Sequence, residues 1–234
     1  MAFNREIWNK FKVSEKQPVG WFCGKCFGGN LYLIPEKVVH SKADRFSGIF
    51  KCTNTLCGHE YSCSGVYKYF SNEFQFEVAK EFYGKKFKEY HPLFFSESIR
   101  FLRLSPLISK QVERELDYSF GHFWNDYSAC ANSIRRSIEY LLDDLEVIER
   151  DNLHQRIEAY QKTNLEIGIK LMSIKWIGNA GSHKDRPTRE DLLDAFDILD
   201  YCYERLFPDN ERESRVNSIS QSINQSKNIR SKNK

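Results

Sequence analysis

Two pairs of closely spaced cysteines constrain the fold of this chain more than any other feature of its sequence. Cys23 and Cys26 lie in "WFCGKC", and Cys52 and Cys57 lie in "KCTNTLC". A two-residue gap lets both thiolates of the first pair turn inward on one tight loop, and a second loop completes a tetrahedron around Zn²⁺. We therefore predict one structural zinc site with these four cysteines as ligands, in a small antiparallel β region of the zinc-ribbon type.

Other interpretations of this cysteine-rich segment remain open. The second pair has a longer gap than the commonest zinc loops, so His59 or Cys63 is an alternative to Cys57 as a ligand. Unrelated core cysteines are the simplest alternative to any metal site. Gly24 and Gly58 are expected to let backbone amides point at sulfur. A site with four protein ligands has no open coordination position, so it stabilises a small domain rather than catalysing a reaction.

The cysteine count and the apolar runs indicate the cellular compartment in which we expect the protein. Seven cysteines, an odd number, are poor candidates for a disulfide framework. No apolar run approaches the roughly 20 residues that span a bilayer, and "MAFNREIWNKFK" lacks the apolar core of a secretion signal. We expect a cytoplasmic protein without a membrane segment.

The periodicity of apolar residues changes at Ser105-Pro106 and predicts an α+β fold. Before this point, short segments rich in aromatic and β-branched residues predict small antiparallel strands: "NLYLI", "SGIFKC", "EYSCSGVYKYF" and "EFQFEV". After it, apolar residues repeat every three or four positions, which predicts a bundle of four to five helices over 106–208. One helical stretch has a possible break at 162–164, and Thr188 with Asp191 resembles a capping box.

Charge divides the chain into three segments with different expected partners. Residues 1–105 carry 16 basic and 10 acidic side chains, residues 106–213 carry 14 and 22, and residues 214–234 carry five and none. The tail at 209–234 has few apolar residues and many Ser, Asn and Lys, so we expect it to be disordered unless a partner orders it. The acidic balance of the helical part argues against broad RNA wrapping by that half.

The basic N-terminal segment and the basic tail are the candidate nucleic-acid surfaces. "VYKYFSNEF" and "KEFYGKKFKEYHPLFF" interleave lysines with aromatic residues, as a surface that stacks on bases and contacts phosphates does. Aromatic residues of a small β domain more often form its core, which is the alternative interpretation.

The stretch "IKWIGNAGSH", residues 174–183, has two readings. Gly178 can let two helices approach closely, Gly181 can end a helix, and Asn179 and His183 can bond its free carbonyls. The alternative is a site in which His183, titrating near neutrality, takes a proton and Asn179 orients a substrate.

The helical half also resembles a known family in the segments that carry these polar residues. "SPLISKQVEREL", "ACANSIRRSIEYLL", "IKWIGNAGSH" and "YCYERLF" look like the prokaryotic family called domain of unknown function 4145, over about residues 106–207, with a zinc ribbon at 21–63 as a common companion. That family resembles the HEPN (higher eukaryotes and prokaryotes nucleotide-binding) group of helical bundles. The resemblance implies a HEPN-like bundle that commonly dimerises, often in restriction, phage defence or toxin–antitoxin systems.

Many HEPN-group proteins are metal-independent ribonucleases that use an Arg, a following polar residue and a His. Carried over to this sequence, Asn179 matches the polar position and His183 matches the His, whereas Gly178 stands where that motif has Arg. Lys175 lies one helical turn earlier and offers a positive charge without the planar guanidinium fork. An arginine from elsewhere or from a partner chain is the other source, with Arg135, Arg136 and Arg186 as the candidates.

The sequence therefore predicts a nucleic-acid-associated or protein-interaction module without a complete catalytic site, and the family resemblance implies a prokaryotic defence or restriction setting for it. We expect a homodimer through the helical bundle and nucleic acid or a restriction or defence protein as partners. The alternative is a metal-independent ribonuclease that uses Asn179, His183 and tentatively Lys175, with a basic residue supplied by dimerisation.

Overall fold

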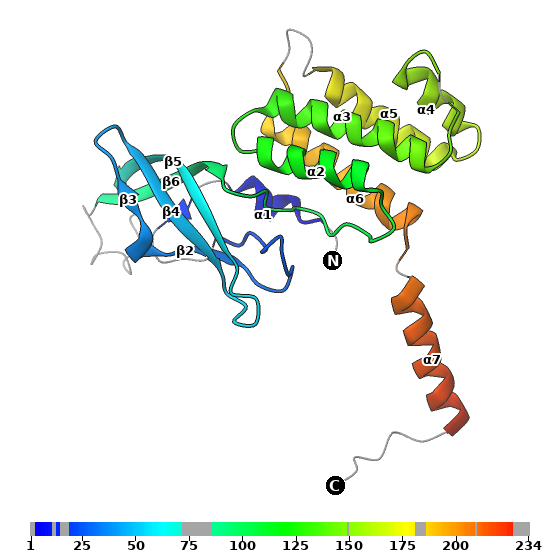
Figure 1. Ribbon diagram of the computed structural model, residues 1–234, viewed down its shortest axis with the longest axis horizontal. Helices are drawn as coiled ribbons and strands as arrows, with labels where there is room; N and C mark the ends of the chain where they lie inside the picture. The colour runs from blue at the N-terminus through cyan, green and yellow to red at the C-terminus, as the bar shows by residue number, and fades with distance from the viewer. Residues whose placement is uncertain are drawn as a thin grey trace.

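The computed structural model describes residues 3–10, 13–14, 19–71, 86–148, 150–180, 186–208 and 210–226. In this part of the chain a short helix and an antiparallel sheet are followed by a group of longer helices, which confirms the α+β class (Figure 1). The strands are β1 (Val13–Ser14), β2 (Leu31–Leu33), β3 (Val39–His40), β4 (Arg45–Cys52), β5 (Glu60–Ser71) and β6 (Lys86–Phe95). The helices are α1 (Arg5–Asn9), the 3-10 helix η1 (Pro35–Lys37), α2 (Lys110–His122), α3 (Tyr127–Asp144), α4 (Leu153–Gln161), α5 (Leu165–Ala180), α6 (Arg189–Leu206) and α7 (Asn210–Ser226).

The sheet has the strand order β1-β6-β5-β4-β2, and β3 pairs with β4. Alternation along β4 gives it one buried and one outer face: Phe46 and Phe50 point into the core, whereas Arg45 and Ser47 are exposed. The predicted strands at "NLYLI", "SGIFKC" and "EYSCSGVYKYF" are confirmed, although their ends differ by a few residues. The one at "EFQFEV" lies outside the described residues.

The helices begin and end largely where the sequence predicts. α4 ends at Gln161 and α5 begins at Leu165, which confirms the break, and Thr188 and Asp191 form a reciprocal capping box at α6. Ser109, Asp126 and Asn152 cap α2, α3 and α4 through their side chains. Within the described part of the chain, no helix has the length and apolar character needed to cross a membrane.

One hydrophobic core joins the sheet to the helices. Trp21, at the first cysteine loop, lies 4.8 Å from Trp124 at the end of α2, measured between ring centroids. Trp8 of α1, a helix that the sequence analysis does not predict, packs 4.2 Å from Phe101. Arg189 of α6 donates a 2.7 Å hydrogen bond to the Trp8 carbonyl. Buried residues on both sides of position 105/106 therefore belong to one hydrophobic cluster.

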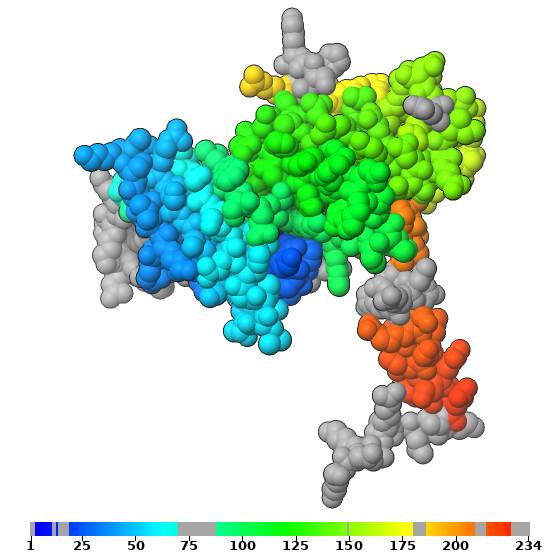
Figure 2. All heavy atoms as spheres, viewed as in Figure 1, coloured from blue at the N-terminus to red at the C-terminus, as the bar shows by residue number. Residues whose placement is uncertain are grey.

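Helix α7 occupies much of the tail for which we expect disorder. It runs from Asn210 to Ser226 and stands away from the rest of the chain in both views (Figures 1 and 2). Val216, Ile219 and Ile223 recur at intervals of three and four residues, a helical spacing that the polar composition of the segment hides. Residues 227–234 lie outside the described part.

Candidate metal centre and neighbouring polar sites

The sulfur atoms of the four cysteines that we predict as zinc ligands lie within 4.8 Å of one another and form a possible metal site. Cys23 and Cys57 are 3.9 Å apart, and Cys26 and Cys52 are 3.7 Å apart, measured between sulfurs. Four thiolates arranged tetrahedrally around zinc at about 2.3 Å have sulfur–sulfur distances of roughly 3.8 Å. The geometry of the cluster therefore fits a tetrahedral ion of this size.

The first cysteine loop is a tight turn closed by its own backbone. The Cys23 amide donates to the Gly29 carbonyl at 2.8 Å, and the Phe27 amide donates to the Cys23 carbonyl at 2.8 Å. Phe27 has a positive φ of 51°, which turns the chain just after Cys26. The Gly28 amide then approaches the Cys26 sulfur at 3.4 Å. This hydrogen bond favours the thiolate form of Cys26, as metal ligation requires.

The second loop is organised by Asn54, a residue that the sequence analysis misses. Its side-chain oxygen accepts from the Leu56 amide at 3.1 Å, and its carbonyl accepts from the Cys57 amide at 3.0 Å. Its own amide points at the Cys52 sulfur at 3.4 Å. An asparagine that bonds two residues ahead is a common turn device, so "CTN" carries a signal that explains how a four-residue gap still brings Cys57 back to the cluster.

Gly24 acts differently from the expectation, whereas Gly58 precedes His59, whose backbone amide hydrogen-bonds to Cys57 as expected. A Cβ on Gly24 would lie 2.3 Å from the backbone nitrogen of Arg100, so Gly24 permits the loop to pack against that backbone. Gly58 has a φ of 57°, the left-handed region that glycine adopts without strain. In the described chain, the amides that reach the Cys26 and Cys52 sulfurs belong to Gly28 and Asn54 instead.

His59 and Cys63, the two alternative ligands, have neighbours different from those of the four clustered cysteines. His59 Nε2 lies 2.5 Å from Glu97 Oε1, and its ring packs edge-on against Tyr61. Cys63 is a buried residue of β5, and burial raises its pKa to about 12. Neither residue belongs to the group of possible metal ligands, which consists of the four cysteine sulfurs.

Electrostatics within the cluster favour a cation at its centre. Burial, together with the neighbouring Cys26 and Cys23 thiols, raises the pKa of Cys52 to about 12, although the Asn54 amide opposes this shift. Burial also acts against ionisation of Cys26, but the Gly28 amide and the other three thiols outweigh it and lower its pKa to about 7. The four groups therefore compete for negative charge, and a divalent cation would let them ionise together.

The outer face of the sheet contains a row of small polar residues between larger ones. In register across four strands, Val39 of β3 faces Ser47 of β4, Ser47 faces Ser64 of β5, and Ser64 faces Phe94 of β6. Val39 is 69% exposed and Phe94 is 58% exposed, whereas the serines between them are short. A floor of serines flanked by larger side chains produces a hollow in this face.

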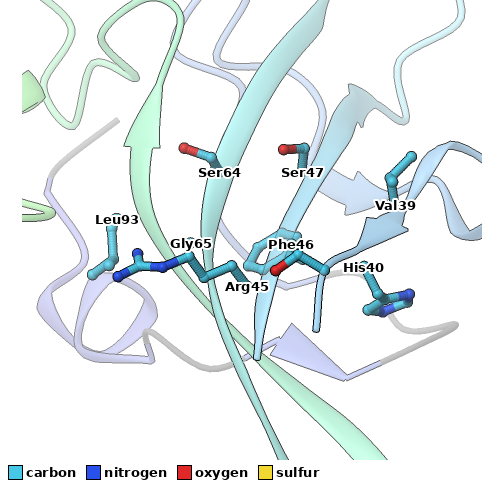
Figure 3. Close-up of a pocket in the computed structure, with 9 residues that line it drawn as sticks. Val39, His40, Arg45, Phe46, Ser47, Ser64, Gly65 and Leu93 are labelled. Carbon is cyan, nitrogen blue, oxygen red and sulfur yellow. The ribbon is translucent and has the colours of Figure 1, made fainter. Parts of the chain in front are cut away.

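The hollow consists of two adjoining depressions of about 300 and 390 Å³ that share Val39, Ser47 and Ser64. Figure 3 shows Arg45 extending toward Leu93 across the strand that carries Ser64 and Gly65. Arg45 is exposed and makes no ion pair with another residue of the described chain. At the other end, the Lys37 ammonium pairs with Glu60 at 3.0 Å.

The aromatic residues of the predicted nucleic-acid surface divide between core and surface. Tyr67 and Tyr90 are buried, whereas Tyr69 and Phe94 are more than half exposed. Lys88 lies over the Tyr67 ring, 5.5 Å from its centroid. Residues 72–85, which include further lysines and aromatics of this segment, lie outside the described residues.

The polar residues at the end of α5 are only partly described. Lys175 is buried, and Asn179, one helical turn later on the same face, is partly exposed. His183, the predicted proton acceptor, lies outside the described residues. Gly178 is buried against α3, where a Cβ would lie 2.9 Å from Arg135 Cβ. The packing role of Gly178 is therefore confirmed, and Arg135 approaches the turn that carries Asn179.

The other two arginines named by the sequence analysis lie elsewhere. Arg136 pairs with the buried carboxylate of Glu115 at 2.7 Å, and Arg186 is an exposed residue before α6. Arg135 pairs with Glu139 at 3.1 Å on its own helix, as its i,i+4 spacing predicts.

Comparison with known proteins supports the family resemblance of the helical part. The family model described as Domain of unknown function (DUF4145) matches residues 119–226, from α2 to the end of α7. Neither the curated proteins nor the solved structures gave a match to the chain.

Proposed function

We propose that this protein is a zinc-stabilised, single-stranded nucleic-acid-binding module that binds through the hollow in the outer face of its sheet. The observation that carries the proposal is the row from Val39 to Phe94, in which an exposed aromatic ring stands beside serine hydroxyls, together with Arg45, which lines the same hollow and has no ion-pair partner among the described residues. Stacking on aromatic side chains together with cationic contacts to phosphate is how sheets bind unstacked bases.

Each part of the hollow has a role in this proposal. Phe94 stacks on a base, Ser47 and Ser64 hydrogen-bond base edges or sugar hydroxyls, and Arg45 contacts a backbone phosphate. The basic tail adds affinity that does not depend on base identity. Duplexes fit this arrangement poorly because their bases are stacked and paired.

Phe94→Ala tests the proposal directly. Loss of one base–aromatic stack is worth about 1–3 kcal/mol, so affinity for a labelled single-stranded oligonucleotide should fall roughly 5- to 150-fold in a fluorescence anisotropy titration. Leu56→Ala, at a 96% exposed position on the second cysteine loop, is the matched control. Equal affinities of wild type and Phe94→Ala would refute binding at the hollow. Deletion of residues 214–234 should weaken binding and reduce its salt dependence.

The finer assignments of the two halves belong to the same proposal. The cysteine cluster supports a zinc ribbon, and the five helices from α2 to α6 together with the family match support a HEPN-like bundle. Leu165, Ile169 and Trp176 form an exposed apolar stripe on α5, which supports homodimerisation through the helical part. A prokaryotic defence or restriction setting, with a partner protein of that kind in the cytoplasm, rests on the family resemblance.

A metal-independent ribonuclease is the second candidate. The observation in its favour is that Lys175 and Asn179 share one face of α5 in the last turns before His183. Cleavage of a single-stranded RNA by wild type but not by His183→Ala would establish it, and identical background rates for the two proteins would eliminate it.

A further inference from the structure

Helix α5 buries a lysine among apolar residues. The helix has the sequence "LEIGIKLMSIKWIGNA", and Lys175 lies next to Ile174, which is fully buried, and one turn before buried Gly178. The residue is 8% exposed. The side chain is largely buried while its ammonium keeps some contact with solvent, and the partial loss of hydration disfavours the charge unless hydrogen-bond acceptors or an opposite charge compensate for it.

The described chain supplies neither of these to Lys175. Its ammonium lies 3.5 Å from the centroid of the Trp176 ring, a favourable cation–π contact, but it makes no hydrogen bond or ion pair with a described residue. Burial, and next the charge of Arg135, lower the pKa of Lys175 from its ordinary value. Among the described residues, the charge that acts on the ammonium is therefore of the same sign.

Arg135 is held beside this lysine by the packing of α3 on α5. Gly178 has no side chain, so the Arg135 side chain runs along the last turns of α5, with its Cδ 3.5 Å from the position of a Cβ at residue 178. Glu139 neutralises the guanidinium only in part, since the Arg135 Nε is buried and has no acceptor among the described residues. Two cationic side chains thus lie on the same part of the α3–α5 contact, and each has unused donors.

We propose that Lys175, Arg135 and Asn179 form a binding site for a phosphate group, the α3–α5 anion site. All three side chains offer N–H donors, and Asn179, one turn beyond Lys175, leaves the site partly open to solvent. A tetrahedral oxyanion has several oxygens that accept from different directions, which suits a guanidinium fork, an ammonium and an amide better than a planar carboxylate does. The site lies on the helical part and is separate from the sheet hollow.

The phosphate group that binds can belong to free phosphate, to a nucleotide or to an RNA backbone. Thermal unfolding of the full-length protein distinguishes these three ligands. The unfolding midpoint is measured at constant ionic strength with inorganic phosphate, a nucleoside monophosphate or a short RNA oligonucleotide. The RNA arm uses the Phe94→Ala background, so that binding at the sheet hollow does not contribute. A ligand of the folded state raises the midpoint in proportion to its occupancy.

Lys175→Met should weaken the binding of the responding ligand about tenfold or more, because a charge-assisted hydrogen bond is lost from a buried site. Arg135→Gln should weaken it as well. Lys170→Met is the matched control, because Lys170 lies on the same helix but pairs with Glu166 and lies over Tyr201. An undiminished response in Lys175→Met, or no response of the parent protein to any of the three ligands, would overturn the proposal. A response to RNA alone would identify the backbone as the source, whatever the outcome at the sheet hollow.

Discussion

The cysteine cluster and the end of α5 differ in the sign of the charge that they bring together. Four thiols converge at the first site and compete for negative charge, whereas Lys175 and Arg135 converge at the second and carry like positive charges. The same electrostatic rule applies to both: like groups held together by a fold favour a ligand of opposite charge. The first arrangement fits a divalent cation, and the second supports an anion.

The two sites also differ in what holds them together. The cysteine loops are closed by local hydrogen bonds, such as those of Gly28 and Asn54. The α5 site depends on helices that are distant in sequence and meet where Gly178 contacts Arg135. Loss of the metal should therefore act first on the sheet, and mutations at the helix contact should act on the bundle.

Metal removal should have the largest effect of the changes considered. We expect one zinc ion per chain, and structural zinc in small sites contributes about 10–16 kcal/mol of apparent binding free energy in peptides. Cys52→Ser or a chelator should unfold the cysteine loops and lower the thermal midpoint. Elemental analysis of freshly purified protein measures the metal content, with Cys63→Ser as a control that keeps all four ligands. A full zinc content in Cys52→Ser would contradict this ligand set.

Trp21→Ala tests how far the two regions are independent. Trp21 is fully buried, and its ring lies 4.8 Å from Trp124 and 5.7 Å from Phe50, so it bridges the sheet and α2. Truncation of a buried Trp costs about 3–5 kcal/mol, which chemical denaturation would detect as a loss of unfolding free energy. Tyr118→Ala, at a half-exposed position on α2, should cost far less. If the helices keep their stability in Trp21→Ala while the sheet melts, the regions unfold separately.

These features differ in how readily the sequence reveals them. Cys23, Cys26, Cys52 and Cys57 are predictable because the loops that join each pair are local. Thr188 and Asp191 are predictable for the same reason, since a capping box spans four residues. Which amides reach the sulfurs is harder to predict, because Gly24 is instead required by the backbone of Arg100.

The remaining features depend on tertiary packing, which the periodicity of apolar residues does not reveal. The row from Val39 to Phe94 requires the register of four strands, and the approach of Arg135 to Lys175 requires the packing of α3 on α5. Helix α1 is too short for periodicity to reveal. In α7, composition indicated disorder, while the spacing of its aliphatic residues supports a helix.

Gly178→Ala is expected to have an intermediate effect, confined to the second site. Its new Cβ would lie 2.9 Å from Arg135 Cβ, near the root of a side chain that cannot swing away, so α3 and α5 must separate slightly. Overpacking of this kind costs about 1–3 kcal/mol, offset by up to about 1 kcal/mol of helix propensity gained from alanine. Denaturant unfolding should show a small net loss of stability, whereas zinc content stays unchanged. A net gain would mean that the helix contact is looser than this distance indicates.

Of these changes, Lys175→Met should alter the free energy of unfolding least, and it should increase this free energy where the others decrease it. It removes a partly dehydrated charge that no carboxylate of the described chain balances, and because such replacements are often neutral or stabilising we expect a gain of at most about 1 kcal/mol. Burial and Arg135 lower the pKa of Lys175 in the folded protein below its ordinary value of 10.5, so the unfolded chain binds more protons between the two values. The unfolding free energy of the wild type therefore rises with pH through that window, and the advantage of Lys175→Met, complete at neutral pH, disappears as pH approaches 10.5. Saturating phosphate should remove the same advantage at neutral pH by stabilising the wild type alone. A variant less stable than the wild type at neutral pH would show that the Trp176 contact already compensates the ammonium, and the contrast with the cysteine cluster would then fail.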